Sequence, residues 1–211
     1  MLDGRRAILA LSRARFDDPS GRPRELFAAL ARERQVIFVE DPTAAEPGVP
    51  DSWELQFPAP RLLVCRPVLS ASDEGPAGPA GPRVAPMLAQ LLRWQDVGEF
   101  VAWLDAPHAL RIARRVGASL VVYDASDAPG ARRVGEDGPL VPLDCELARA
   151  ADLVVAAGPS DEPHRWSRMA ARALADLAEA ERLPRALRRR RAPRERRGDE
   201  RPGRRAAEGR R

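Results

Sequence analysis

Acidic and basic side chains follow directly after several short apolar segments, which is the arrangement needed for a site at the edge of a parallel sheet. Leu120–Tyr123 is apolar and rich in β-branched and aromatic residues, and Asp124 and Asp127 come soon after it. A short apolar run that ends in a polar turn predicts a strand buried on both faces. Because ligands of open α/β sheets lie beyond the carboxyl ends of the strands, we expect these carboxylates to face a ligand.

Other polar side chains follow other predicted strands and are further candidates for the site. A carboxylate at a strand end suits a general base, because burial and a neighbouring acid both raise its pKa. The further candidates are Arg13, Arg15, Asp17, Arg22, Glu40, Asp41, Asp105 and His108.

Structural roles compete with chemical roles for three of these residues. Asp124 could cap a helix or accept a hydrogen bond from a backbone N–H in an Asx-turn. Arg22 could anchor the first loop by pairing with Asp17 or Asp18, and His108 could cap the helix that follows it.

Six strands and five helices are expected to position these side chains. The strands are predicted at residues 7–11, 36–39, 61–65, 100–104, 120–123 and 153–156, and the helices at 23–34, 84–97, 109–116, 142–151 and 161–183. Gly117 is expected at the C′ position of the third helix. Residues 43–60 and 70–82 are rich in Pro and acidic residues or in Gly-Pro repeats, and both are predicted to be loops.

This alternation of strands and helices predicts an α/β fold, a Rossmann-like, doubly wound and mostly parallel sheet over residues 1–160. A helical extension is expected over 161–183 and a disordered Arg-rich tail over 184–211. The two cysteines, Cys65 and Cys145, have no metal-ligand or disulfide spacing and are predicted to be small buried hydrophobes. Trp94 and Trp103 are expected in the core.

Charge is distributed unevenly along the chain. The formal net charge is +4, although residues 182–211 alone contain 14 Arg and 4 acidic residues. The part that precedes this tail is therefore acidic, and binding of nucleic acid or of an anionic membrane by the tail is a secondary alternative. The longest N-terminal apolar run is too short for a signal peptide or a membrane span, so we expect a cytoplasmic protein.

Several sequence signatures of common enzymes are absent. The chain has no GxGxxG, no GxxxxGK[ST] and no GxSxG motif, and its two histidines lack metal-ligand spacing. These absences argue against dehydrogenases, P-loop NTPases, α/β-hydrolases and metalloenzymes. We expect no metal and no bound cofactor.

Five segments resemble the N-terminal half of bacterial GT-B glycosyltransferases. They are similar to the family-1/family-4-like transferases associated with UDP-galactopyranose mutase and to exopolysaccharide glucuronosyltransferases. The segments are Leu11-Ser-Arg-Ala-Arg-Phe-Asp with Arg22-Pro-Arg-Glu-Leu26, Val36-Ile-Phe-Val-Glu-Asp-Pro42, Trp103-Leu-Asp-Ala-Pro107, Val121-Val-Tyr-Asp-Ala-Ser-Asp127 and Arg149-Ala-Ala-Asp-Leu-Val-Val-Ala-Ala-Gly-Pro-Ser160.

The resemblance implies half of a GT-B fold that binds the acceptor, a glycan or a lipid-linked sugar, in polysaccharide biosynthesis. It implies a catalytic base at Asp127 or Asp124 and acceptor contacts from Arg15, Asp17, Arg22 and His108. It also implies a nucleotide-sugar donor held mainly by a second domain, and it allows peripheral association with the inner face of the membrane.

The chain departs from the family pattern after Ser160, where no second Rossmann-like pattern follows. From this departure we expect a truncated or frameshifted product that is inactive alone. A stand-alone binding module whose partner supplies the donor half remains the alternative.

Overall fold

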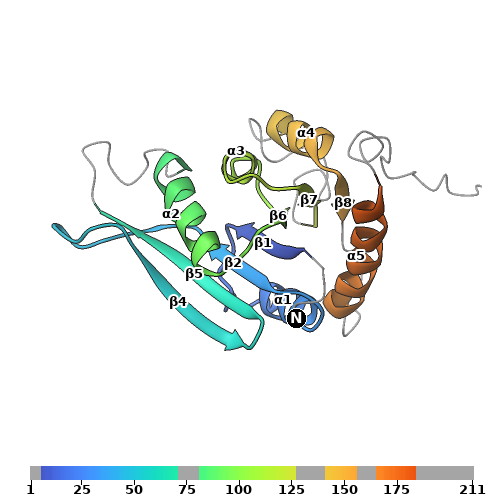
Figure 1. Ribbon diagram of the computed structural model, residues 1–211, viewed down its shortest axis with the longest axis horizontal. Helices are drawn as coiled ribbons and strands as arrows, with labels where there is room; N and C mark the ends of the chain where they lie inside the picture. Colours follow the sequence, from blue (N-terminus) through green and yellow to red (C-terminus); the bar gives the residue numbers. More distant parts are fainter. Residues whose placement is uncertain (1–5, 71–80, 127–140, 156–164, 184–211) are drawn as a thin grey trace, which may run out of the picture.

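A computed structural model describes residues 6–70, 81–126, 141–155 and 165–183 (Figure 1). These residues form one mostly parallel sheet with helices on both of its faces, which confirms the predicted Rossmann-like fold class. The strands are β1 (Ala7–Ser12), β2 (Val36–Glu40), β3 (Thr43–Ala44), β4 (Ser52–Ala59), β5 (Leu62–Leu69), β6 (Phe100–Leu104), β7 (Leu120–Asp124) and β8 (Leu153–Val155). The helices are α1 (Arg22–Ala31), α2 (Gly81–Trp94), α3 (Ala109–Arg115), α4 (Val141–Ala150) and α5 (Arg165–Arg182).

The strand order places a topological switch point between β1 and β6. The order is β3-β5-β2-β1-β6-β7-β8, with β4 pairing antiparallel to β5. From β1 the chain passes through α1 to β2 on one side, whereas β6 lies on the other side of β1 and leads through α3 to β7. The carboxyl ends of β1 and β6 therefore border the crevice in which ligands of such sheets bind.

Alternating side chains of the central strands supply two separate cores, one on each face of the sheet. On the first face, Ile8, Phe38 and Trp103 pack with residues of α1 and α5. On the second face, Leu9 and Leu104 pack with residues of α2, α3 and α4. Figure 1 shows this division of the helices between the two faces. Because both faces are covered, the central strands have the continuous apolar sequences from which they were predicted.

Two elements differ from the sequence-based expectation. Residues 43–60 were predicted to be a loop, but they contain β3 and the eight-residue edge strand β4. Edge strand β4 alternates exposed and half-buried residues and lacks the apolar run that marks a central strand. Trp94, which was expected in the core, is 78% exposed at the end of α2, whereas Trp103 is buried as predicted.

The predictions for Gly117 and Cys65 are confirmed. Gly117 follows the C-cap of α3 with a φ of 84°, the left-handed conformation that favours glycine. Cys65 is buried, and burial raises the pKa of its thiol to about 12, so it behaves as an inert apolar side chain. The side chain of Cys145 and the Gly-Pro repeats at 75–80 lie outside the described residues.

Candidate functional site at the carboxyl edge of the sheet

The ends of β1 and β6 hold a hydrogen-bonded pair, Ser12 and Asp105, across the switch point. The Ser12 hydroxyl donates to Oδ2 of Asp105, and the backbone N–H of Arg13 donates to Oδ1 at 3.3 Å. Leu11 and Leu104 are register partners, so the next residue on each strand meets the other at the edge. Ser12 is buried and Asp105 is half-buried.

Burial raises the pKa of Asp105 above its ordinary value. The Ser12 hydroxyl, the Arg13 N–H and the Arg22 guanidinium oppose this effect, and the nearby Asp124 carboxylate adds to it. A carboxylate whose pKa is raised takes up protons more readily near neutral pH. Asp105 is therefore the described strand-end acid whose surroundings best suit a general base.

A cavity of about 830 Å³ opens beside this pair, over the second face of the sheet. Ser12 lines it together with residues that follow β2 and β6, among them Asp41 and His108. Its apolar wall includes Leu11, Val39 and Leu110. This combination of apolar wall, strand-end polar groups and switch-point position is typical of a small-molecule site.

Helix α3 contributes three cationic side chains to the rim of the cavity. Arg111, Arg114 and Arg115 are exposed, and they make no ion pair with another residue in the described part of the chain. At the start of the same helix, Nε2 of the N-cap residue His108 lies 3.7 Å from Oδ1 of Asp41. Guanidinium groups without an internal partner can bind a phosphate or carboxylate of a ligand.

Glu40 also lines the cavity, and its carboxylate is paired with two arginines. Its carboxylate accepts hydrogen bonds from Arg66 Nε at 2.6 Å, Arg15 Nη1 at 2.9 Å and the Phe16 N–H at 2.8 Å. Burial would raise the pKa of Glu40, but these hydrogen bonds outweigh burial and hold the pKa below its ordinary value. Arg15 therefore serves the loop after β1 by pairing with Glu40, at the edge of the cavity.

Asp124 lies in a different environment from Asp105. Its side chain is 2% exposed, and Oδ2 accepts a hydrogen bond from Trp103 Nε1 at 3.2 Å and pairs with Arg22 Nη2 at 2.8 Å. Oδ1 accepts the Ser126 N–H at 3.0 Å, which is the Asx-turn considered as its structural role. Neither Asp124 nor Asp105 lines the cavity directly, and Asp124, with both oxygens bonded, is a buried anchor for Arg22.

The remaining predicted site residues are dispersed. Arg22, for which pairing with Asp17 or Asp18 was the structural alternative to an acceptor contact, pairs with Asp124. Asp17 is exposed and lines a separate hollow beside β4 and α1. His108 occupies the N-cap position of α3 without a side-chain capping hydrogen bond. Asp127 lies outside the described residues.

Ser12 and the arginines of α3 were not among the residues predicted for the site. Ser12 follows the apolar run of β1 as Asp105 follows β6, and this parallel is a usable signal. Recognising the pair, however, requires knowing that β1 and β6 are neighbours, which only the strand order reveals.

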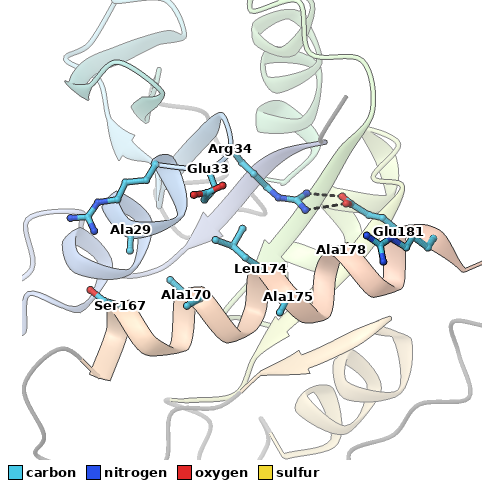
Figure 2. A pocket seen from close by; sticks show the side chains of 12 residues that line it. Ala29, Glu33, Arg34, Ser167, Ala170, Leu174, Ala175, Ala178 and Glu181 are labelled. Carbon is cyan, nitrogen blue, oxygen red and sulfur yellow. Dashed lines mark hydrogen bonds and ion pairs between the residues drawn. The ribbon is translucent and has the colours of Figure 1, made fainter. Parts of the chain in front are cut away.

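A second hollow of about 660 Å³ lies between α1 and α5, on the first face (Figure 2). Its floor is formed by small and apolar side chains such as Ala29, Ala170 and Leu174. An ion pair closes one end, in which Arg34 donates to Glu181 through Nη1 at 2.6 Å and Nη2 at 3.0 Å. None of the residues predicted for the site lines this hollow.

The described residues contain neither a membrane-spanning helix nor a cluster of metal ligands. No helix there is long and apolar enough to cross a bilayer. The described side chains also contain no cluster of three or more His, Cys, Asp or Glu residues that could hold a metal ion.

No family model and no curated protein matches the chain. Among solved structures, the chain is similar to one described as trehalose-6-phosphate from E. coli bound with UDP-2-fluoro glucose, with 13% identity and a TM-score of 0.43. That match covers 80% of this chain and 43% of the other, so this chain spans less than half of the length of its neighbour. An α,α-trehalose-phosphate synthase (UDP-forming) from Burkholderia xenovorans in complex with glucose-6-phosphate gives 16% identity, 71% and 39% coverage and a TM-score of 0.37.

Proposed function

We propose that this chain is the acceptor-binding half of a nucleotide-sugar-dependent glycosyltransferase. The observation that carries the proposal is the Ser12–Asp105 pair, which lies at the switch point of the sheet beside a cavity of about 830 Å³. Supporting it are the GT-B-like segments of the sequence and the raised pKa of Asp105. Both oxygens of Asp124 are engaged, by Arg22, Trp103 and the Ser126 N–H, whereas Asp105 is bonded to the Ser12 hydroxyl that lines the cavity.

In the proposed reaction, the acceptor hydroxyl lies against Ser12. Its proton passes to the Ser12 oxygen as the Ser12 proton passes to the Asp105 carboxylate. The acceptor oxygen forms a bond to the anomeric carbon of the donor sugar. The bond from that carbon to the phosphate oxygen breaks, and the nucleotide diphosphate leaves with the electron pair. A second domain or a partner protein, by this proposal, holds that diphosphate.

The arginines of α3 favour an acceptor that carries an anionic group. Arg111 and Arg114 are exposed on the cavity rim and have no carboxylate partner in the described chain. The Glu40 carboxylate is already paired with Arg15 and Arg66, so it does not neutralise them. A sugar phosphate or uronic acid could therefore place its sugar hydroxyls near Ser12 and its anionic group on α3.

A transfer assay tests the assignment of the base. UDP-glucose and glucose 6-phosphate would be incubated with the full chain together with the domain or partner protein that supplies its donor half. Release of UDP would be measured for the wild type, Asp105→Asn, Ser12→Ala and Glu54→Gln. We expect Asp105→Asn to slow release by about 10²-fold, because a general base contributes at least that much. Glu54→Gln alters an exposed residue of β4 and should leave the rate unchanged. Equal rates of UDP release above background for the wild type and Asp105→Asn would contradict the proposal.

A further inference from the structure

Helix α5 reaches the candidate site through one stacked arginine. Arg22, at the start of α1, has its guanidinium carbon 5.0 Å from the ring centroid of Trp166, in the first turn of α5. The same guanidinium pairs with Asp124 at the end of β7. Both Arg22 and Trp166 are at least nine-tenths buried, so this contact is shielded from solvent.

Arg22 also lies beside the Ser12–Asp105 pair. It lines a void of about 20 Å³ together with Ser12, Asp105 and Asp124. That volume has room for about one water molecule and excludes a sugar, so Arg22 acts on the site by its charge. Among the described residues, the charged and polar groups that act on Asp105 are Ser12 from β1, the Arg13 N–H, Arg22 from α1 and Asp124 from β7.

The far end of α5 is fixed independently. Arg34, which is 4% exposed, binds Glu181 in the last turn of α5 through both terminal nitrogens and also donates to the Arg6 carbonyl at 3.2 Å. The hollow shown in Figure 2 separates this ion pair from the first turn of the helix. Because each end has its own anchor, the Trp166 contact can be altered while the other end of α5 stays attached.

We propose that Trp166 is a positioning residue, which holds the Arg22 cation between Asp105 and Asp124 and thereby sets the charge surrounding the Ser12–Asp105 pair. The inference rests on the proposed function for its catalytic meaning, but the physical coupling can be measured without any substrate. An unstacked arginine would regain rotamer freedom and could turn towards solvent. The aromatic ring of α5 therefore keeps the cation at the site.

The test is the titration of the Asp105 carboxyl, followed by carbon NMR in the full chain and assigned with Asp105→Asn. Arg22 lowers the pKa of Asp105, so loss of the stack should raise the titration midpoint. We expect Trp166→Leu to shift the Asp105 midpoint upward. Trp166→Phe retains an aromatic face and should keep the midpoint near that of the wild type. Leu177→Ala, a buried substitution elsewhere on α5, is the matched control and should leave the midpoint unchanged.

The proposal would be overturned if Trp166→Leu lost as much stability as Leu177→Ala but left the Asp105 midpoint unchanged. Trp166 would then be a packing residue only. If Trp166→Leu does not fold, Arg22→Gln provides the second measurement, because it removes the cation directly. An Asp105 midpoint that is the same in Arg22→Gln and in the wild type would equally overturn it.

The outcome can be separated from that of the proposed function. A shifted midpoint together with an unaffected transfer rate in Asp105→Asn would support the coupling and reject the base. An unchanged Asp105 midpoint in Trp166→Leu, together with a slowed transfer rate in Asp105→Asn, would reject the coupling and support Asp105 as the base.

Discussion

Asp105 directly follows β6 and Asp124 is the last residue of the adjacent strand β7, but their surroundings differ. Asp124 has both oxygens occupied by Arg22, Trp103 and the Ser126 N–H. Asp105 receives one hydroxyl and one backbone N–H and is only half-buried. The two carboxylates therefore lie in different hydrogen-bonding environments at the same edge of the sheet.

Asp105→Asn should lower activity without lowering stability at neutral pH. Because the pKa of Asp105 is raised in the folded chain, the folded state binds this proton more tightly than the unfolded state. Its contribution to stability is therefore lost as the pH rises from the unfolded pKa through the folded one. Urea denaturation should show Asp105→Asn gaining stability relative to the wild type as the pH rises through this window.

The exposed Asp96→Asn, which makes the same change of acid to amide away from the Ser12–Asp105 pair, serves as the control. An Asp105→Asn variant that becomes less stable than the wild type as the pH rises would show that the charged form of Asp105 stabilises the fold.

Glu40→Gln should destabilise the chain by about 3 kcal/mol at pH 7, because it leaves Arg15 and Arg66 without their shared carboxylate. The pKa of Glu40 is lowered, so its contribution is present above the unfolded pKa and lost as the pH falls through the folded value. Denaturation at pH 7 and at pH 3 should show the difference between variant and wild type shrinking in acid. A difference that is independent of pH would refute this account of the cluster.

The sequence predicted which residue types lie at the strand ends, but it did not predict which side chains they bind. The Asx-turn of Asp124 is local and could be predicted as an option. The Arg22–Asp124 pair joins residues more than 100 positions apart and depends on where α1 lies over β7. Such long-range pairing is set by topology, which no local pattern encodes.

Helix α5 is part of the same core as the sheet. Trp166, Met169 and Leu177 are buried against α1 and the strands of the first face. The sequence predicts a helix here from its Ala, Leu, Arg and Glu content, but it does not say where the helix packs. The packing explains how α5 can influence residues at the edge of the sheet.

Leu177→Ala should cost about 3 kcal/mol, since a fully buried leucine leaves a cavity when it is truncated. Arg172→Ala, on the exposed side of α5, should cost less than about 0.5 kcal/mol, because its spacing of 4.0 Å from Asp176 makes only a weak surface pair. Chemical denaturation of both variants measures the difference. Equal stabilities would mean that α5 is not bound to the core in solution.

Edge strand β4 shows why one element escaped sequence-based prediction. Its Trp53, Leu55 and Phe57 recur at every second position, which is a strand signal, but acidic and proline residues in the same stretch favoured a loop. Phe57 is 68% exposed beside the outer edge of the sheet. Exposed edges that carry apolar side chains promote pairing between chains.

Phe57→Lys should reduce self-association while changing the free energy of unfolding by less than about 0.5 kcal/mol, as expected for an exposed residue. Sedimentation at several concentrations measures association, and urea denaturation measures stability. Association that is unaffected by the lysine would show that this edge does not mediate contacts between copies.

For the whole molecule, the sequence predicted the fold class but left the strand order open. The apolar runs identify strands buried on both faces, because helices cover both sides. Placing β1 between β2 and β6 creates the switch point and brings Ser12 to Asp105. The arginines of α3 face the cavity only because α3 lies on the second face, above the same edge.

The most direct test of the central claim is to map where an anionic sugar binds. Amide spectra of the full chain would be recorded during titration with glucose 6-phosphate, with glucose and inorganic phosphate as comparisons, and repeated for Arg111→Ala/Arg114→Ala and for Arg93→Ala on α2. We expect shifts at Ser12, Asp41 and residues 108–115 that need both sugar and phosphate, weaken with the α3 variant and persist with Arg93→Ala. Shifts elsewhere, or equal effects of the two variants, would contradict an acceptor site at this edge of the sheet.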